Sequence, residues 1–252
     1  MRAGASGDGG LPLPLVIGHR GASALEPENS LAAFTRAARD GADGVELDVL
    51  CCATGEVIVF HDDDLARLAG RPERVANLTL AELRTVTLTS GARIPTLEEA
   101  LDACGPELLV NIELKTEGYA GGPIGPLVDR VAAIVARAGA AARVLVSSFH
   151  PRAVWTWMRR APDVPAGLLF EAEAALPLRA AWARHWLHPR ALHPEAALCA
   201  PETVQRWHER GYLVNVWTVD DAHTLHALAA MGVDGVITND PARTRRILQQ
   251  GR

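Results

Sequence analysis

The sequence Val45-Glu46-Leu47-Asp48-Val49 alternates apolar and acidic side chains, which is the pattern of a β-strand. Side chains two positions apart in a strand point to the same face, so Glu46 and Asp48 are expected to lie side by side. The apolar side chains of the other face predict that the strand is buried. Two carboxylates in a buried position are costly unless a cation lies between them. We therefore expect this strand to carry part of a functional site.

Three further segments place charged or histidine side chains beside short apolar runs. They are Gly18-His19-Arg20-Gly21, Val59-Phe60-His61-Asp62 and Asn111-Ile112-Glu113-Leu114-Lys115. Any one acid at a strand end is more often a solvated loop residue than a ligand, and either His61-Asp62 or Arg20-Gly21 alone is compatible with an ordinary turn. The site is inferred from the four segments together.

The composition is that of a globular protein and excludes two classes of partner. Of the 252 residues, 48% are hydrophobic and 22% charged, and the formal net charge is -5. A chain without a basic surface gives no electrostatic reason to expect nucleic-acid binding. No apolar run approaches the roughly 18 residues needed to span a membrane.

The chain is predicted to contain one domain after a short tail. Residues 1–12 begin with a Gly-rich stretch that lacks the apolar core of a secretory signal, and they are expected to be flexible, whereas residues 13–252 form the domain. The cysteines show no metal-binding spacing, so free thiols and a reducing cytoplasm are expected. They are Cys51, Cys52, Cys104 and Cys199.

Strand-like and helix-like segments alternate along the whole chain. Expected strands cover residues 15–18, 45–49, 108–114, 143–147, 165–170, 185–188, 213–219 and 234–238, with an additional β-like run at 57–60. Expected helices cover residues 30–40, 96–103, 125–138, 151–160, 172–184, 200–210, 220–230 and 241–249. Ser30 or Asn29 is expected to cap the first helix, and Thr96 with Glu99 forms a capping box for the second.

Eight strands, each followed by a helix, predict a parallel sheet of the α/β class. Eight strand–helix units in about 240 residues suit a closed (β/α)8 TIM barrel better than an open doubly wound sheet. The sequence also lacks the Gly-rich turn that follows the first strand in dinucleotide-binding open sheets. The polar, broken stretch of residues 62–95 is interpreted as a small insertion after the second strand.

In such barrels the functional side chains lie at the carboxyl ends of the strands. Carboxylates without cysteine or clustered histidine favour a hard cation, Mg2+ or Ca2+. Arg20 and Lys115 beside them suit a phosphate group. Two histidines near a phosphate can act as general acid and general base.

Other polar residues at the strand ends receive no role. Asn239 and Asp240 follow the last strand, and His188 is expected near the mouth of the barrel but most simply as a structural residue. Trp217 suits a pocket wall at least as well as the core. Six histidines are interpreted as surface or helix residues: His150, His185, His193, His208, His223 and His226.

A set of short motifs occurs in order along the chain. It comprises His19-Arg20-Gly21, Pro27-Glu28-Asn29-Ser30, Phe34, Gly41-Ala42-Asp43, Glu46-Leu47-Asp48-Val49, His61-Asp62, Arg67, Ile94-Pro95-Thr96-Leu97-Glu98-Glu99, Glu113-Leu114-Lys115, Ser148-Phe149 and Val216-Trp217-Thr218-Val219. Together these motifs resemble the glycerophosphodiester phosphodiesterase family over roughly residues 15–248. The family usually has Asn after Trp-Thr-Val. This chain has Asp220 there, which we interpret as a helix cap.

The resemblance implies a TIM barrel and a role for each matched residue. Glu46, Asp48 and Glu113 match the metal ligands of one divalent cation, and His19 and His61 match the general acid–base pair. Arg20 and Lys115 match phosphate contacts, whereas Phe149, Glu171 and Trp217 fall where such enzymes contact glycerol or line the pocket.

The resulting hypothesis is metal-dependent hydrolysis of glycerophosphodiesters to glycerol 3-phosphate and an alcohol, in lipid and glycerol metabolism, by a cytoplasmic monomer or homodimer. A phospholipase of the phosphoinositide or sphingomyelin type is the first alternative, although the chain has few aromatic residues and no basic amphipathic helix for a membrane. A non-catalytic binding barrel or a metal-dependent sugar isomerase explains fewer of the site residues.

Overall fold

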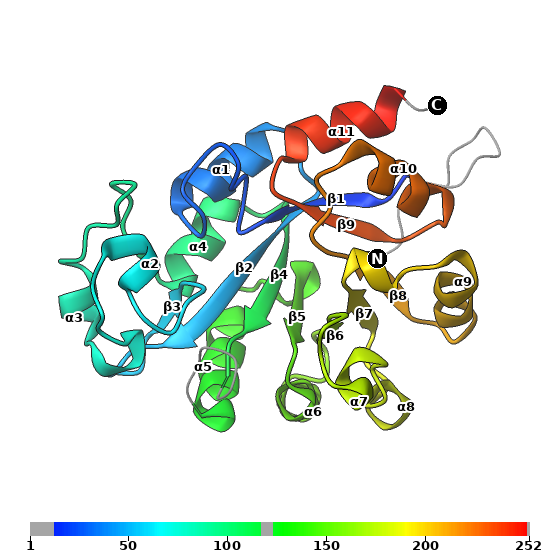
Figure 1. The fold of residues 1–252 in the computed structure, drawn as a ribbon. Coiled ribbons are helices and arrows are strands. Elements are labelled where there is room, and N and C mark those ends of the chain that lie inside the picture. Colours follow the sequence, from blue (N-terminus) through cyan, green and yellow to red (C-terminus); the bar gives the residue numbers. More distant parts are fainter. Residues whose placement is uncertain (1–12, 117–122, 251–252) are drawn as a thin grey trace.

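The computed structural model describes residues 13–116 and 123–250, and its centre is a closed parallel sheet. In sequence order the parallel strands are β1 (Leu15–His19), β2 (Gly44–Cys51), β4 (Leu109–Leu114), β5 (Val144–Ser148), β6 (Ala166–Phe170), β7 (Ala191–Pro194), β8 (Leu213–Val216) and β9 (Gly235–Thr238). The sheet closes because β1 pairs with both β2 and β9 (Figure 1). This arrangement confirms the (β/α)8 barrel and rules out the open sheet.

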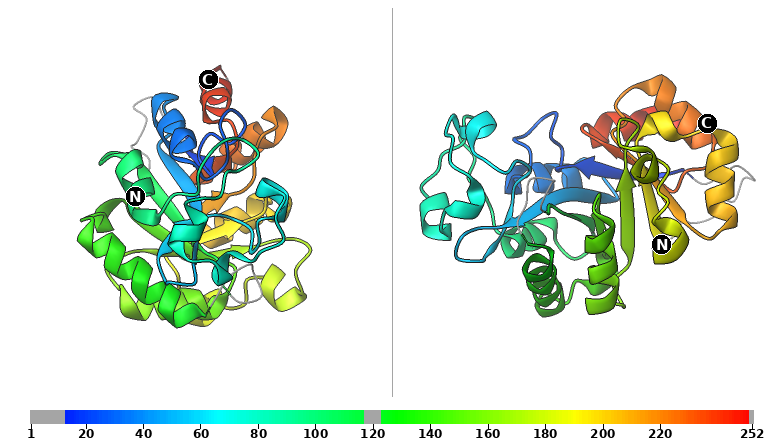
Figure 2. Two further views of the ribbon diagram at one scale, coloured as in Figure 1. Left: turned by 90° about the vertical axis from the view of Figure 1, so that its left-hand side faces the viewer. Right: turned by 60° about the horizontal axis from the view of Figure 1, so that its bottom comes forward.

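Helices surround the sheet, as both further views show (Figure 2). The longer ones are α1 (Leu31–Arg39), α4 (Leu97–Cys104), α5 (Ile124–Arg137), α6 (Pro151–Arg160), α9 (Pro201–Glu209), α10 (Ala222–Ala230) and α11 (Pro241–Gln250). Their buried faces pack on the outward side chains of the strands and form one large apolar core. The outer face of each parallel strand is therefore covered, as βαβ connections require.

The expected helix caps form with the expected residues. Ser30 accepts a hydrogen bond from the backbone N–H of Ala33 at the start of α1. Thr96 and Glu99 make both bonds of the capping box at the start of α4. Asn29, the other candidate cap, instead adopts a left-handed backbone with φ of 54°.

Strand β2 continues past the barrel and turns back as a hairpin. Its end pairs antiparallel with β3 (Val57–Val59) through a turn in which Gly55 has a φ of 93°. The following residues contain α2 (Ala66–Ala69), the 3-10 turn at Val75–Asn77 and α3 (Leu80–Leu83). They enclose a small apolar cluster of their own and project from one side of the barrel (Figures 1 and 2).

The predicted strand at 185–188 is wrong. Residues Arg184–Leu187 form the short helix α8, which ends at His188, and the seventh barrel strand is β7 at Ala191–Pro194. The predicted helix at 172–184 is reduced to α7 (Leu176–Arg179). The error has a physical cause. Strand β7 is only four residues long, and His193 and Pro194 interrupt the apolar run that would indicate a buried strand.

Two of the remaining predictions concern the tail and the cysteines. The predicted flexible tail, residues 1–12, lies outside the described residues, and the assignment of residues 13–252 to one domain stays a prediction. All four cysteines are free, as expected. Burial raises the pKa of the Cys104 thiol to about 12, so this thiol stays protonated at neutral pH.

Close contact between β2 and β4 predicts that Gly44 tolerates no side chain. A Cβ at Gly44 would lie 2.8 Å from the carbonyl oxygen of Leu109 on the paired strand. Gly44→Ala is expected to lower the free energy of unfolding by about 1–3 kcal/mol, measured by urea denaturation. Gly125→Ala is the matched control, since nothing lies within 4 Å of its Cβ position in α5. The control should be neutral or slightly stabilising, and equal stability of the two variants would contradict the packing argument.

Candidate active site

A cavity of about 320 Å³ opens at the carboxyl end of the barrel strands. All ten residues predicted for the site line it, although they come from positions between 19 and 217 in the chain. The full lining is His19, Arg20, Glu46, Asp48, His61, Asn111, Glu113, Lys115, Phe149, Leu169, Glu171, Trp217 and Ile237. Sequence reasoning gave no role to Asn111, Leu169 or Ile237.

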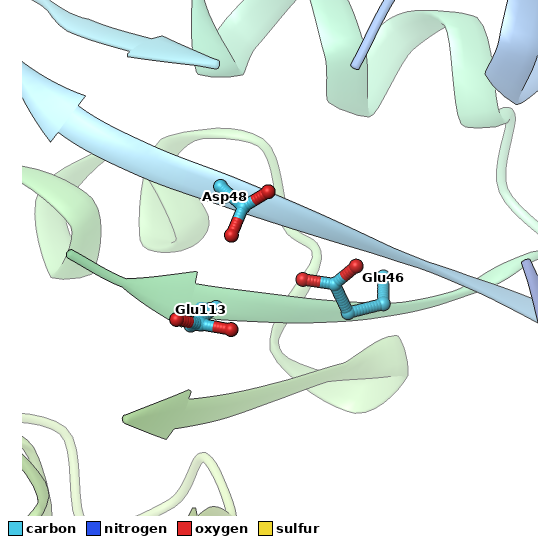
Figure 3. A group of neighbouring side chains, drawn as sticks. All are labelled: Glu46, Asp48 and Glu113. Carbon is cyan, nitrogen blue, oxygen red and sulfur yellow. The ribbon is translucent and has the colours of Figure 1, made fainter. Parts of the chain in front are cut away.

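Three carboxylates converge inside this cavity. Glu46 and Asp48 lie on the same face of β2, and Asp48 is paired in register with Glu113 on β4. Their carboxylate oxygens lie within 4.8 Å of one another, and the three side chains face a common space (Figure 3). All three residues are buried, with exposed fractions of 4%, 1% and 8%. The alternation of the strand therefore places the acids as the sequence predicts.

Two cations compensate part of this negative charge. Lys115 Nζ lies 2.7 Å from Glu113 Oε1 and 3.2 Å from Asp48 Oδ1, and the lysine is itself buried. Arg20 Nε lies 3.4 Å from Asp48 Oδ2. The sequence predicted Arg20 and Lys115 as phosphate contacts, and that role stays a prediction. In the structure both side chains compensate the charge of the acid cluster.

These contacts and the burial of the site shift the pKa values of Asp48 and Glu46 in opposite directions. Burial opposes ionisation of Asp48, but Lys115, His61 and Arg20 together hold its pKa well below the usual range. Burial, followed by repulsion from Asp48 and Glu113, raises the pKa of Glu46 well above its ordinary value. Glu46 is thus the acid whose charge is least compensated by protein groups.

The donor set fits a hard divalent cation. It consists of carboxylate oxygens, and Glu46 Oε1 is buried without a hydrogen-bond partner among the described residues. A buried, unpaired carboxylate oxygen is costly, and a cation bound between Glu46, Asp48 and Glu113 would satisfy it. Oxygen ligands of this type suit Mg2+ or Ca2+ better than zinc.

His19 lies at the end of β1, in register with Glu46 of β2. Its Nδ1 is 2.7 Å from Oδ1 of Asn239, which follows the last strand, β9. Burial and the neighbouring Arg20 charge lower the pKa of His19 below its ordinary value. This shift favours the neutral ring, which is the form that accepts a proton.

His61 reaches the same cavity by way of the β2–β3 hairpin. The backbone N–H of Phe60 donates to the carbonyl of Asp48 at 3.0 Å, so the next residue stands over the acid cluster. His61 Nδ1 lies 2.7 Å from Asp62 Oδ1, and Arg67 Nε donates to the other oxygen of Asp62 at 2.7 Å. A carboxylate at Nδ1 can compensate the charge of this ring when it carries two protons.

Several supporting residues were quoted in the motifs but received no predicted role in the site. Glu28 accepts hydrogen bonds from Arg20 at 2.8 Å and from Arg67 at 2.7 Å, so one ion-pair chain joins the two histidine loops. Asn29 donates to Asp48 Oδ2 at 2.8 Å. Composition and periodicity carry no signal for these contacts, because they join segments far apart in sequence.

The opposite side of the cavity is apolar. Phe149 and Trp217 meet edge to face with ring centroids 5.4 Å apart, and Trp217 Nε1 donates to the carbonyl of His193 at 2.8 Å. Glu171 follows β6 and adds a carboxylate to this wall. Phe149, Glu171 and Trp217 all line the cavity, and their contact with glycerol stays a prediction.

Three predictions on individual residues are wrong. His193 is fully buried in β7 rather than on the surface, and burial lowers its pKa to about 3. His188 is exposed before β7, at the amino end of that strand, and therefore lies away from the mouth. Asp221, and not Asp220, caps α10, accepting from the backbone N–H of Thr224 at 2.8 Å.

The fold and this cavity define a class of protein, a (β/α)8-barrel enzyme with an acidic site flanked by two histidines. Residues 19–243 match the model of the Glycerophosphoryl diester phosphodiesterase family. A glycerophosphodiester phosphodiesterase of Caldanaerobacter subterraneus subsp. tengcongensis is 32% identical over 246 residues, covering 94% of this chain and 98% of that protein.

Solved structures agree with the sequence comparison. A phosphodiesterase of Oleispira antarctica, in complex with the product sn-glycerol-3-phosphate, has a TM-score of 0.82 and 26% identity, covering 94% of this chain and 97% of that chain. A glycerophosphoryl diester phosphodiesterase structure from Silicibacter pomeroyi has a TM-score of 0.83 and 28% identity, covering 96% of this chain and 95% of that chain. The chain therefore belongs to the glycerophosphoryl diester phosphodiesterase family, and it is a phosphoric diester hydrolase. Within residues 13–116 and 123–250, none of the helices has the length and apolar character of a membrane span.

The unusual state of Glu46 predicts a pH dependence of stability in the metal-free protein. A carboxyl group whose folded pKa is raised stabilises the fold below its unfolded pKa, about 4.3, and this stability is lost as pH rises through the folded value. With EDTA present, the unfolding free energy of the wild type is expected to fall relative to Glu46→Gln between pH 5 and 8.

Urea denaturation across that range measures the difference. The control is Glu107→Gln, which changes an exposed glutamate outside the cavity and should show no such trend. A constant difference between wild type and Glu46→Gln at all pH values would contradict the raised pKa.

Proposed function

We propose that this enzyme hydrolyses glycerophosphodiesters to glycerol 3-phosphate and an alcohol, with one divalent cation, Mg2+ or Ca2+, and the pair His19 and His61. The observation that carries the proposal is the single cavity in which three buried carboxylates meet two histidines, each held at Nδ1 by an oxygen. The structure of the Oleispira antarctica phosphodiesterase in complex with the product sn-glycerol-3-phosphate supports this choice of product.

The binding of the phosphate is the first task of the site. When bound at Glu46, Asp48 and Glu113, a divalent cation neutralises phosphate charge and polarises the P–O bonds. Lys115 and Arg20 line the same cavity and supply further positive charge for the oxygens that become more negative in the transition state. Phe149 and Trp217 offer an apolar wall to the carbon atoms of glycerol.

The two histidines are suited to different halves of the proton transfer. Neutral His19 takes the proton from the attacking hydroxyl, which belongs either to water or to the glycerol of the substrate. As the new P–O bond forms, the bond from phosphorus to the alcohol breaks. Where the glycerol hydroxyl attacks, the product of this step is a cyclic phosphate, which water then opens to complete the hydrolysis to glycerol 3-phosphate. Protonated His61, whose positive charge Asp62 compensates, gives a proton to the departing oxygen. Each transfer can contribute about 10²–10⁴-fold to the rate.

The setting of the reaction follows from the substrate class. A soluble, deacylated diester fits a chain with a formal net charge of -5 and no basic patch evident in its sequence. We propose a cytoplasmic monomer or homodimer that acts on glycerophosphodiesters in lipid and glycerol metabolism. The four free cysteines are compatible with that compartment.

An assay of glycerol 3-phosphate release tests the activity. Purified protein is incubated with several glycerophosphodiesters in EDTA, and then with Mg2+ or Ca2+ restored, beside vesicles of phosphatidylinositol and sphingomyelin. Cation-dependent release from the soluble diesters is expected. Hydrolysis of the vesicle lipids alone would favour a phospholipase, and inactivity on every substrate would reject the proposal.

Replacing either histidine tests its role. His19→Ala and His61→Ala are each expected to lower kcat by about 10²–10⁴-fold while leaving the thermal unfolding of the protein unchanged. His226→Ala, an exposed histidine on α10, is the control and should keep wild-type turnover. Turnover within threefold of wild type in either site variant would exclude that histidine.

Cation binding is expected to stabilise the fold independently of turnover. At a cation concentration about 100 times Kd, the wild type should gain about 2.7 kcal/mol, which raises Tm by roughly 5–10 °C relative to EDTA. Glu46→Gln and Glu113→Gln should show a much smaller rise, and Glu107→Gln a wild-type rise, by differential scanning fluorimetry. Equal rises in all four proteins would place the cation elsewhere.

A further inference from the structure

Asp220 lies on an exposed loop after β8 and accepts three hydrogen bonds from the end of β9. One oxygen accepts from the backbone N–H of Asn239 at 2.8 Å and from the hydroxyl of Thr238 at 3.0 Å. The other oxygen accepts from Nδ2 of Asn239 at 2.5 Å. Asp220 therefore holds Asn239 by both its backbone and its side chain, whereas the cap of α10 is left to Asp221.

The bond to Asp220 determines which way the Asn239 amide faces. An ionised carboxylate can only accept hydrogen bonds, so the NH2 group of Asn239 must point toward it. The amide oxygen then points the other way, to His19 Nδ1 at 2.7 Å and to the hydroxyl of Ser23 at 2.8 Å. The orientation of an amide that is ambiguous by shape is thus settled by its partners.

An amide oxygen opposite His19 in turn settles the position of the ring proton. Asn239 Oδ1 cannot donate, so His19 Nδ1 must carry the hydrogen of the contact. In the neutral ring the remaining nitrogen, Nε2, is then unprotonated. Nε2 is the atom with which this ring can accept a proton in the cavity that His19 lines.

We infer that Asp220 is a positioning residue for His19: acting through Asn239, it selects the ring tautomer and orientation that leave Nε2 ready to accept a proton. The inference rests on the proposed role of His19 as the base. It assigns a purpose to the acid that stands where the family resemblance leads one to expect Asn. Partners behind a catalytic or metal-bound histidine orient other sites in the same manner.

Asp220 acts on His19 only through the neutral amide of Asn239, which suits a histidine that has to stay neutral to act as a base. His61 contacts a carboxylate directly, because Asp62 lies at its Nδ1. A carboxylate in contact with a ring favours the doubly protonated form, whereas a neutral amide oxygen sets the tautomer without adding charge. Asn239 therefore lies between His19 and the charged Asp220. Through Asn239, Asp220 determines which ring nitrogen of His19 carries the hydrogen, without placing a charge against the ring.

Replacing Asp220 by Asn is expected to reverse this direction. The new side-chain oxygen stays opposite the backbone N–H of Asn239, because that donor cannot turn round. Its NH2 group then meets the NH2 group of Asn239, and the contact is relieved when the Asn239 amide flips. The flipped amide donates to His19 Nδ1, so the ring proton moves to Nε2 and the neutral ring can no longer accept a proton there.

A second substitution is expected to restore the original direction of the hydrogen bond, while placing a carboxylate in contact with the ring. In the double variant Asp220→Asn with Asn239→Asp, the residue at 239 has only acceptor oxygens. One oxygen accepts from Asn at 220, and the other accepts again from His19 Nδ1. A role in local folding alone does not predict this reciprocal rescue.

The tautomer is measured directly by NMR on the full chain labelled with 15N-histidine, above pH 7.5, in EDTA. The two ring nitrogens have distinct 15N shifts according to which carries the proton, and His19→Ala identifies the signals of His19. We expect an Nδ1–H ring in the wild type, an Nε2–H ring in Asp220→Asn, and a hydrogen again on Nδ1 in the double variant. Asp221→Asn, with the same charge change on the next residue, should match the wild type.

Turnover gives the second readout. Asp220→Asn is expected to lower kcat about 10–100-fold with KM nearly unchanged. The double variant should recover part of that loss, since the carboxylate now in contact with the ring favours its doubly protonated form. An Nε2–H ring in the wild type, or an unchanged Nδ1–H ring in Asp220→Asn, would overturn the inference. Full activity of His19→Ala would contradict both the role of His19 as the base and the role of Asp220 as its positioning residue. Loss of activity in His19→Ala, together with the expected change of tautomer in Asp220→Asn, supports both roles.

Discussion

The site depends on the closure of the parallel sheet by β1. Because β1 pairs with β2 on one side and β9 on the other, His19 lies next to Glu46 and within hydrogen-bond distance of Asn239. Residues more than two hundred positions apart in the chain thus share one cavity. An open sheet would leave the first and last strands apart, and it would separate the histidine from the residues that orient it.

Closure also brings three buried carboxylates together. Asp48 is kept ionised by Lys115, Arg20 and Asn29, whereas Glu46 has fewer compensating partners. The protein therefore carries part of the charge balance and leaves the rest to a cation of suitable size and ligand preference. The same arrangement explains why lysine and arginine, which suit a phosphate, are found in direct contact with the acids.

The two histidines reach the cavity by different routes, and their partners differ accordingly. His19 ends a barrel strand and contacts a neutral amide, whereas His61 follows a hairpin that extends β2 and contacts a carboxylate. The hairpin also links His61 to the insertion, since Arg67 of α2 binds Asp62 and Glu28. A change in the insertion can therefore alter the position of His61 without touching the barrel.

The sequence by itself determined the barrel class and the acid, histidine and basic residues of the cavity, because strand alternation and apolar runs are local signals. It failed at β7, where a four-residue strand holds a fully buried histidine, and at Asp220, whose partner belongs to another strand. Only the tertiary structure decided which polar groups meet across the closed sheet: Asn29 with Asp48, Glu28 with two arginines, and Asp220 with Asn239. Hydrogen bonds between distant segments depend on three-dimensional direction, and periodicity along the chain carries no record of it.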